Sequence, residues 1–482
     1  MLRRYAPTTV AICLLVAIAA RRYAAMANAD ALLPALISTQ RWTLFYWGQD
    51  RLANLVPLLA MPIRNPLWNF QFQTLIIAAS FFGLAAMFVS FHCWSRGIRP
   101  RPLEHGAATM LAGLAVMAPM HVVAGYRFIV EQLYFVSVLL FLGAIYAWNR
   151  RRAYTLGAIS LQIAFLVNPS LMLATPFAWL LDDEREGRLR RFAEFVAAAL
   201  TAFAITTLAG RYLATGEHVD RPYDKFSLEH LRAGTSAVAG NIAGSMSDGL
   251  ATTFVLLSVA VVAARARGIR PRSRSVYLAL PVFATVWFVA FSTNGWVIQN
   301  AHEFRYFYPL YVTFMLYVAG ASTECVLAVR PLLRRVAPLR PRLVTLLLTS
   351  SVLISMLVAV MVIRHVRVAA MVAAGESVEA AREFDVTLVV GNYWTTWPVI
   401  VAGRAEGLDL LGVTYRSDPI LGDIQAALDL AEHQNRAVLV LCSGIDAPTC
   451  ADELSRISTR DWMLSGTVST QPLVISVQSM SD

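Results

Sequence analysis

Long apolar segments alternate with short polar gaps over the first 364 residues. A membrane-spanning helix needs ~20 consecutive apolar residues. Segments of this kind lie near 7–20, 70–94, 106–123, 128–148, 192–212, 250–266, 276–293, 305–325 and 343–363. A further apolar region, 154–181, is interrupted at Asn168-Pro169 and predicts two short helices that form a hairpin. The pattern therefore predicts a polytopic α-helical membrane protein with about eleven transmembrane helices.

The arginines gather in the gaps between apolar segments, which sets the predicted topology. Clusters occupy 96–101, 150–152, 185–191, 265–274 and 330–342. Because cytoplasmic loops carry the excess of Lys and Arg, these gaps are assigned to the cytoplasm; Arg21-Arg22 is the exception. The N-terminus is then cytoplasmic, and its apolar segment is interpreted as a signal anchor in the bacterial inner or plasma membrane. An odd number of spans leaves the C-terminus outside.

The tail after residue 364 has a different pattern. Short apolar runs at Asp385–Gly391, Ala437–Cys442 and Pro472–Gln478 predict strands, and Asp423–Gln434 has helical spacing. The alternation predicts a small α/β domain over 365–482, outside the membrane, after a transmembrane domain over 1–364 whose first outer loop is 24–69. The tail has no Gly-rich phosphate loop and no nucleophile elbow, so we expect no independent active site there.

Composition supports the membrane assignment. Of 482 residues, 57% are hydrophobic and only 15% are charged, against about 25% in soluble domains. The net charge of +10 follows from the topology and needs no nucleic-acid partner, although the basic clusters could also hold anionic membrane lipid. Cys442 and Cys450 lie close together in the tail, and a disulfide is expected if the tail faces an oxidising compartment. No cysteine pair has the spacing of a metal site.

Asp50, in Trp47-Gly48-Gln49-Asp50-Arg51, is the leading candidate for chemistry. A carboxylate at a membrane surface can take a proton from an incoming hydroxyl or amine, so Asp50 is interpreted as a general base. The alternative is that Asp50 caps a helix starting near Leu52, because Asp is a preferred N-cap residue. A divalent cation at Asp50 is compatible with the sequence, but no spacing requires one.

Two further groups of polar residues fall at predicted outer ends of spans. His302, Glu303, Arg305 and Tyr306 form one, and Arg and Tyr there suit the phosphate of a lipid carrier. The alternative is that Arg305 snorkels or pairs with Glu303. The other group holds His121, Tyr126, Arg127 and Glu131, where Arg127 and Glu131 could instead pair along one helix.

The long outer loop 213–249 carries residues suited to an acceptor site. They are His218, Asp220, Arg221, Tyr223, Asp224, Lys225, Glu229 and His230. A solvated loop of no specific function would have the same composition, so the sequence leaves both interpretations open.

Together these features resemble the GT-C glycosyltransferases, which include protein mannosyltransferases and lipid A aminoarabinose transferases. The resemblance rests on an acid in the first outer loop, interrupted mid-chain helices, the Arg305-Tyr306 mouth, and the run Asn392-Tyr393-Trp394-Thr395-Thr396-Trp397-Pro398 after the last span. The first loop also has short helical stretches at Ala31–Ile37 and Leu52–Ala60. Protein mannosyltransferases carry an Asp-Glu pair in this loop, whereas here Asp50 is followed by Arg51.

The resemblance implies transfer of a sugar from a polyprenyl-phosphate or polyprenyl-diphosphate donor to an extracytoplasmic glycan, lipid or protein, with inversion at the anomeric carbon. Asp50 would be the base, and Arg305, Arg127 and Tyr306 would bind the donor phosphate. The substrate would be lined by Trp47, Gln49, Arg51, His302, Glu303, Tyr393 and Trp394, with Trp47, Trp296 or Trp394 stacking on sugar faces. The alternatives are a transporter or flippase of a lipid-linked glycan, an O-antigen ligase or polymerase using loop 213–249, and an adaptor in which Asp50 is replaceable.

Overall fold

The computed structural model describes residues 2–47, 53–131, 133–150, 152–180, 187–214, 231–246, 274–330, 341–414, 421–434, 438–456, 462–468 and 473–479. The chain divides into two compact units. The helical unit comprises Met1–Tyr23, Leu75–Thr206 and Asp220–His365; the mixed unit comprises Ala24–Thr74, Thr207–Val219 and Val366–Asp482. The mixed unit thus includes the first outer segment as well as the C-terminal tail, which the sequence analysis had assigned to different domains.

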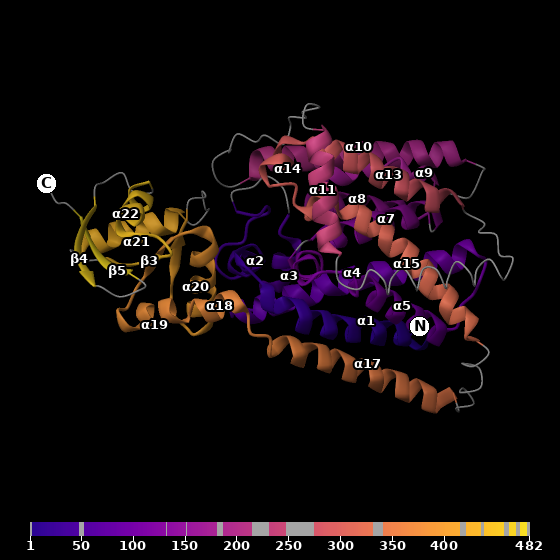
Figure 1. Ribbon diagram of the computed structural model, residues 1–482, viewed down its shortest axis with the longest axis horizontal. Coiled ribbons are helices and arrows are strands. Elements are labelled where there is room, and N and C mark those ends of the chain that lie inside the picture. Colours follow the sequence, from indigo (N-terminus) through magenta and orange to yellow (C-terminus); the bar gives the residue numbers. More distant parts are fainter. Residues whose placement is uncertain are drawn as a thin grey trace. The chain divides into compact units, whose positions relative to one another are not determined.

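The helical unit consists of long helices and short irregular turns (Figure 1). Its elements are α1 (Leu2–Tyr23), most of α4 (Pro66–Ser95), α5 (Pro102–Met117), α6 (Val122–Tyr126), η2 (Arg127–Glu131), α7 (Tyr134–Arg150), α8 (Tyr154–Val167), η3 (Pro169–Ala174), α9 (Phe177–Leu180), most of α10 (Arg188–Leu213), α11 (Leu231–Ser245), α13 (Arg274–Ser292), α14 (Gly295–Gln299), η6 (Phe304–Phe307), α15 (Tyr308–Ala328) and α17 (Pro341–Arg364). The element η2 is a π-helix, and η3 and η6 are 3₁₀ helices.

Five helices among the described residues are long and apolar enough to cross a membrane. They are Tyr5–Met26, Pro66–Ser95, Arg188–Leu213, Phe304–Ala328 and Thr349–Ala373. The pair Val122–Glu131 and Tyr134–Asn149, bent by 55°, makes a sixth if it is one broken span. The protein is therefore a helical membrane protein. The eleven predicted spans exceed this number; one of them, 250–266, lies outside the described residues.

The predicted interruption at Asn168-Pro169 is present. Helix α8 ends at Val167, and Pro169 begins the 3₁₀ helix η3. Proline has no N–H to continue the helical ladder and restricts the residue before it, which accounts for the extended backbone at Asn168.

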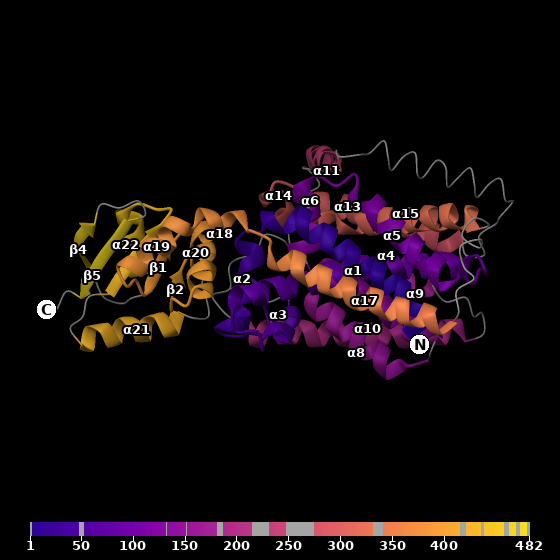
Figure 2. The same cartoon turned by 90° about the horizontal axis from the view of Figure 1, so that it is seen from below.

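The apolar surfaces of the unit fit lipid on the outside and close packing on the inside. Helix α17 exposes large apolar side chains along one face, among them Leu353, Ile354 and Leu357. Helix α1 packs against both α5 and α17, and Figure 2 shows α17 running alongside α1. Exposed apolar faces of this length suit contact with lipid tails rather than water.

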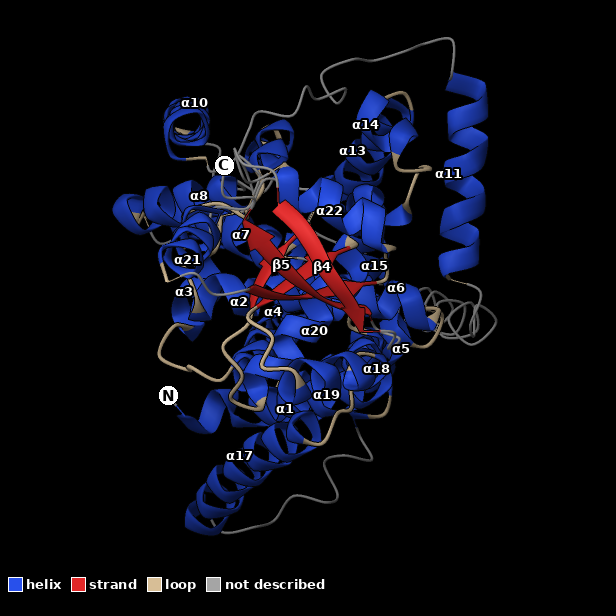
Figure 3. Cartoon of the chain, turned by 90° about the vertical axis from the view of Figure 1, so that its left-hand side faces the viewer, coloured by secondary structure: helices blue, strands red, loops and turns tan. Residues whose placement is uncertain are grey.

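The mixed unit contains a five-stranded sheet with helices around it; its strands are red in Figure 3. The strands are β1 (Leu388–Gly391), β2 (Leu411–Val413), β3 (Val438–Ser443), β4 (Trp462–Val468) and β5 (Leu473–Ser479) in the order β2-β1-β3-β5-β4. Strands β1, β2 and β3 are parallel, while β5 runs antiparallel to β3 and β4. The helices are α2 (Ala29–Thr39), α3 (Leu55–Ala60), α18 (Ala369–Ala373), α19 (Gly375–Glu383), α20 (Tyr393–Ala405), α21 (Leu421–His433) and α22 (Ala447–Ser455).

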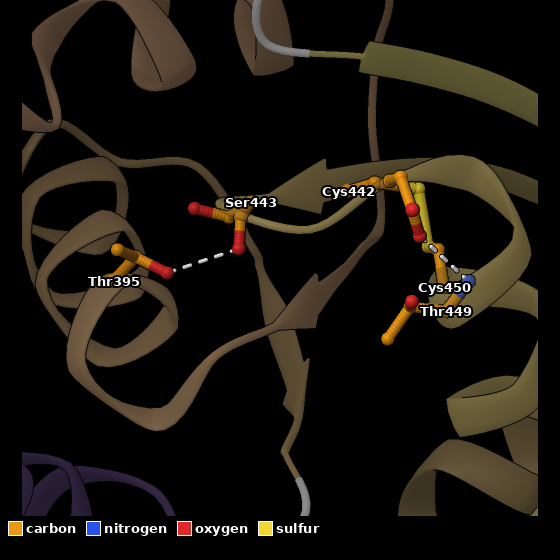
Figure 4. The surroundings of a disulfide bond; sticks show 6 residues. Thr395, Cys442, Ser443, Thr449 and Cys450 are labelled. Atoms are coloured by element: carbon orange, nitrogen blue, oxygen red, sulfur yellow. Dashed lines mark hydrogen bonds between the residues drawn. A yellow bond between two sulfur atoms is a disulfide. The ribbon is translucent and has the colours of Figure 1, made fainter.

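A disulfide joins the end of β3 to the helix that follows it. Cys442 bonds Cys450 of α22, with 5.9 Å between the two Cα atoms (Figure 4). Asp446 caps this helix by accepting a hydrogen bond from the backbone N–H of Thr449 at 3.0 Å. Hydrogen bonding from Thr449 lowers the pKa of the Asp446 carboxyl. The disulfide and the cap therefore fix both ends of the short turn between β3 and α22.

Close approach of two strands explains one glycine of the sheet. A Cβ atom at Gly391 would lie 2.1 Å from the carbonyl oxygen of Ser443 on β3. On the next turn of chain, the Thr395 hydroxyl donates to the same Ser443 carbonyl at 2.9 Å (Figure 4). Helix α20 is thereby held directly at the end of β1, which is where the Tyr393-Trp394 pair lies.

Candidate functional site

Two arginines and two glutamates form a closed ring in the helical unit. Arg127 and Glu131 come from the π-helix η2, while Glu303 and Arg305 flank the start of the 3₁₀ helix η6. Glu131 accepts a hydrogen bond from Nη1 of Arg127 and another, at 3.2 Å, from Nη1 of Arg305. Glu303 lies 3.0 Å from Nε of Arg127 and 2.8 Å from Nε of Arg305. Each carboxylate therefore bridges both guanidinium groups.

The two carboxylates of the ring differ in burial. The side chain of Glu131 is 1% exposed, whereas that of Glu303 is 22% exposed. The arginine side chains lie between these values, at 14% for Arg127 and 15% for Arg305. Glu131 therefore lies on the buried side of the ring. Glu303 lies on the more exposed side, from which a ligand could reach the guanidinium groups.

Aromatic packing brings the two arginine-bearing segments together. Phe128, next to Arg127, is fully buried, and its ring lies 5.6 Å from that of Phe304 and 4.3 Å from that of Tyr311. Phe304 precedes Arg305, so this contact sets the two arginines side by side. Arg127 and Glu131 are the first and last residues of the π-helix η2. The wider turn of a π-helix is often found at functional sites. Apolar positions far apart in the sequence thereby position the charged ones.

The loop that carries Glu303 has an unusual backbone. Ala301 and His302 have positive φ angles of 52° and 54°, a region that L residues other than Gly, Asn and Asp seldom adopt. Asn241 of α11 stabilises this shape, because its side-chain Nδ2 donates to the carbonyls of Ala301 at 3.0 Å and His302 at 2.9 Å. Helix α11 comes this close because Gly234 has no side chain: a Cβ there would lie 2.3 Å from the carbonyl of Ser292 and 3.1 Å from the His302 ring.

The interrupted helix α8 reaches the same region. Asn168, the last residue before the break, donates to the Tyr308 hydroxyl at 3.1 Å. The Tyr308 ring stacks on Tyr134 with 4.9 Å between ring centres, and Trp287 donates to the carbonyl of Tyr306 at 2.9 Å. Buried polar groups at membrane depth need such partners, so these bonds support the irregular backbone under the ring.

The ring unites residues that the sequence had placed in two separate groups. Arg127 and Arg305 were expected to bind phosphate together with Tyr306, which accepts from Nη2 of Arg305 at 3.4 Å. The alternative pairings of Arg127 with Glu131 and Arg305 with Glu303 are also both present. The ring as it stands carries two positive and two negative charges. Guanidinium forks of this kind bind carboxylate and phosphate oxygens alike.

Asp50, the predicted base, lies outside the described residues together with Gln49 and Arg51. On either side of this segment the chain is held in place, because Phe45 and Ala53 form an antiparallel bridge. Helix α3 starts at Leu55 with Asn54 in the N-cap position. The helix predicted over Leu52–Ala60 therefore begins three residues later than expected, at Leu55, while both roles considered for Asp50 stay predictions.

The aromatic residues expected to line a substrate differ in exposure. Trp47 and Tyr393 are buried, at 2% and 0% exposed, and both lie within the core of the mixed unit. The Trp47 ring packs edge-on against Trp397 with 6.0 Å between ring centres. Packing therefore occupies these two rings, which leaves them no open face for a sugar, while Trp394 is 43% exposed. The side chain of Trp296 lies outside the described part of the structure.

Tyr393 also takes part in a hydrogen-bonded group that the sequence analysis missed. Its hydroxyl donates to a carboxylate oxygen of Asp30 at 2.9 Å and lies 3.0 Å from the hydroxyl of Tyr46. Asp30 is in the first turn of α2, so this group joins the first outer segment to α20 within the mixed unit. Acidic residues are common in the first turn of a helix, so Asp30 did not stand out in the sequence as a candidate for this contact.

Residues 218–230, the candidates for an acceptor site, lie outside the described ranges. Within those ranges, no group of three or more His, Cys, Asp or Glu side chains could hold a metal ion. His302, predicted to line the substrate, lies directly beside Glu303 in the strained loop.

A second buried charged cluster lies at the other end of α15, and it too was missed from sequence. Glu324 is contacted by Nε2 of His92 at 2.9 Å and by Nη2 of Arg96 at 3.0 Å. The other ring nitrogen of His92 lies within hydrogen-bonding distance of the Tyr277 hydroxyl. From Arg305 to Glu324 the chain rises roughly 30 Å at 1.5 Å per residue, about the thickness of a bilayer core. The two clusters therefore lie at opposite ends of one span.

No family model matches the chain, and no curated protein matches it.

Proposed function

We propose that this protein is an integral-membrane glycosyltransferase of the GT-C type, which moves a sugar from a polyprenyl-phosphate or polyprenyl-diphosphate donor to an extracytoplasmic acceptor. The observation that supports it best is the ring in which Arg127 and Arg305 share two carboxylates at the end of a span. A pair of guanidinium groups held this way suits the phosphate of a lipid whose isoprenoid tail lies among the spans.

The chemistry assigns a role to each group. As the glycosidic bond to phosphate breaks, negative charge develops on the leaving oxygen, and Arg127 and Arg305 stabilise it. The anomeric centre becomes oxocarbenium-like and is attacked from the opposite face, which inverts its configuration. Asp50 removes the proton of the attacking hydroxyl or amine. In this proposal the ring and Asp50 both act on the extracytoplasmic side, with the N-terminus in the cytoplasm and the α/β part of the mixed unit outside.

Replacing Asp50 tests the enzymatic role. In the Asp50→Asn variant, we expect the rate of sugar transfer to fall at least about 100-fold, because loss of a general base typically costs that much. The assay follows release of decaprenyl phosphate from a panel of decaprenyl-phosphate-linked hexoses in membrane vesicles that carry the cell's own glycan, lipid and protein acceptors, by mass spectrometry. The control is Asp409→Asn, since Asp409 is 91% exposed in a surface ion pair with Arg404.

Full activity in a normally expressed Asp50→Asn variant would show that Asp50 is not the base. A transporter or flippase, the main alternative, would instead move the intact donor across the bilayer without releasing decaprenyl phosphate. Fluorescent donor analogues that become accessible on the opposite side of the vesicle, with the glycosidic bond intact, would favour that alternative.

A further inference from the structure

The two carboxylates of the ring are held by backbones of different kinds. Glu131 lies in a continuous helical segment, α6 followed by η2, and its side chain is 1% exposed. Glu303 stands before η6, directly after two residues with positive φ angles, and its side chain is 22% exposed. Only Glu303 is therefore placed on a segment that can turn outward without unwinding a helix.

The charges of the ring set what a ligand must do to bind. With both glutamates in place, the two arginines are neutralised, and an incoming phosphate would meet two carboxylates as well as two guanidinium groups. If Glu303 leaves, Arg127 and Arg305 retain one shared carboxylate, that of Glu131, and the site carries one net positive charge. The phosphodiester of a polyprenyl-phosphate-linked sugar, which carries one negative charge, can then take the vacated place with its charge compensated.

The positions of the Glu303 oxygens match this replacement. One oxygen contacts Nε of Arg127 at 3.0 Å and the other contacts Nε of Arg305 at 2.8 Å. A phosphate group also has two oxygens on one central atom, so it can place one oxygen against each guanidinium group in the same way. Retention of Glu131 keeps the arginines aligned while the exchange takes place.

The loop before Glu303 is held in a defined shape. Ala301 and His302 both have positive φ angles, which residues other than Gly, Asn and Asp seldom adopt. The Asn241 side chain holds both carbonyls in this conformation. The contacts of Asn241 are to Ala301 and His302 and not to Glu303, so the Glu303 side chain can turn outward while the loop keeps this shape.

We propose that Glu303 is an exchangeable counter-ion: in the absence of donor its carboxylate occupies the place of the donor phosphate, and the phosphate of the lipid carrier displaces it while Glu131 stays. This inference rests on the proposed phosphate-binding role of Arg127 and Arg305. It makes Glu303 a residue that weakens binding of every anion, so that only a ligand with additional contacts, such as an isoprenoid tail, is held.

The test measures binding of decaprenyl phosphate to the full-length protein in phosphatidylcholine nanodiscs. For Glu303→Gln we expect binding roughly tenfold tighter than wild type, since the competing carboxylate loses its charge. Glu303→Asp keeps the charge on a shorter side chain and should give an affinity between the two. Inorganic phosphate, measured in parallel, should bind detectably only to Glu303→Gln, which distinguishes a free anion from a lipid-linked one.

Matched variants separate failure of the inference from failure of the proposed site. Arg305→Gln and Arg127→Gln should lose binding of decaprenyl phosphate; wild-type affinity in both would overturn the phosphate site itself. Loss in the arginine variants, combined with unchanged or weaker binding in Glu303→Gln and Glu303→Asp, would leave the site intact and overturn the exchange. Glu194→Gln, which removes a carboxylate from the surface pair with Arg190, is the control and should bind as wild type.

Discussion

The two charged clusters at opposite ends of α15 are built from similar residues but in different ways. At one end, Arg127 and Arg305 share two carboxylates on irregular backbone, a π-helix and a strained loop. At the other end, the carboxylate of Glu324 contacts both His92 and Arg96. The side chain of Glu324 is 4% exposed and that of Arg96 is 3% exposed. Glu324 and His92 lie on the regular helices α15 and α4.

The difference indicates separate roles. A buried carboxylate between groups on two regular helices ties those helices together. The ring at the other end has one buried and one part-exposed carboxylate, so it can exchange one partner without losing the other. Ionisable residues inside a membrane are costly and mark function by default. The backbone and the number of partners are the reason why we propose that the ring, rather than the Glu324 cluster, binds a ligand.

Removal of the carboxylate at Glu324 should have the largest effect on stability. In Glu324→Gln, Arg96 is left buried without its charged partner, and loss of one member of a buried pair costs about 3–5 kcal/mol. We expect a clear fall in the thermal midpoint in detergent micelles, followed by intrinsic tryptophan fluorescence, and near wild-type binding of decaprenyl phosphate by the protein that remains folded.

Glu303→Gln provides the contrast in the same measurement. Its side chain is part-exposed, and Glu131 still contacts both arginines, so its midpoint should stay much closer to wild type than that of Glu324→Gln. If both variants were equally destabilised, the distinction between a structural cluster and an exchangeable ring would be lost.

A conservative change in the ring should have a smaller effect, on binding rather than on stability. Lysine in Arg305→Lys keeps the charge but cannot contact Glu131 and a second group through a rigid planar fork. We expect affinity for decaprenyl phosphate to fall roughly tenfold. Arg404→Lys, in a surface ion pair with Asp409, is the control. Wild-type affinity in Arg305→Lys would mean that charge alone, without bidentate geometry, holds the ligand.

Much of the fold follows from local patterns. The interruption at Asn168-Pro169 is a property of proline, and the strands near 388 and 438 are short apolar runs bounded by polar residues. The helix that begins at Tyr393 was missed, because its run Tyr393-Trp394-Thr395-Thr396-Trp397-Pro398 has strand-like aromatic and β-branched residues. Its N-cap Asn392 was the available signal, and it accepts a hydrogen bond from the N–H of Trp394.

The site was predictable in parts but not as a ring. Arg127 with Glu131 and Arg305 with Glu303 each pair at short sequence separation, which spacing can indicate. The cross-contacts of Arg127 with Glu303 and of Arg305 with Glu131 join residues more than 170 positions apart and depend on the packing of Phe128 against Phe304. No local pattern carries that information. The burial of Trp47 and Tyr393 depends in the same way on tertiary packing. Their aromatic character alone had suggested that both line the substrate and that Trp47 stacks on a sugar.

The central claim is that Arg127 and Arg305 bind the phosphate of a lipid carrier. The most direct measurement is an electron cryomicroscopy structure of the protein in nanodiscs with decaprenyl phosphate. We predict phosphate density between the two guanidinium groups, Glu131 unchanged, and the Glu303 side chain turned away from the ring. An intact ring of four charged residues, with the lipid phosphate bound elsewhere at saturating ligand, would contradict it.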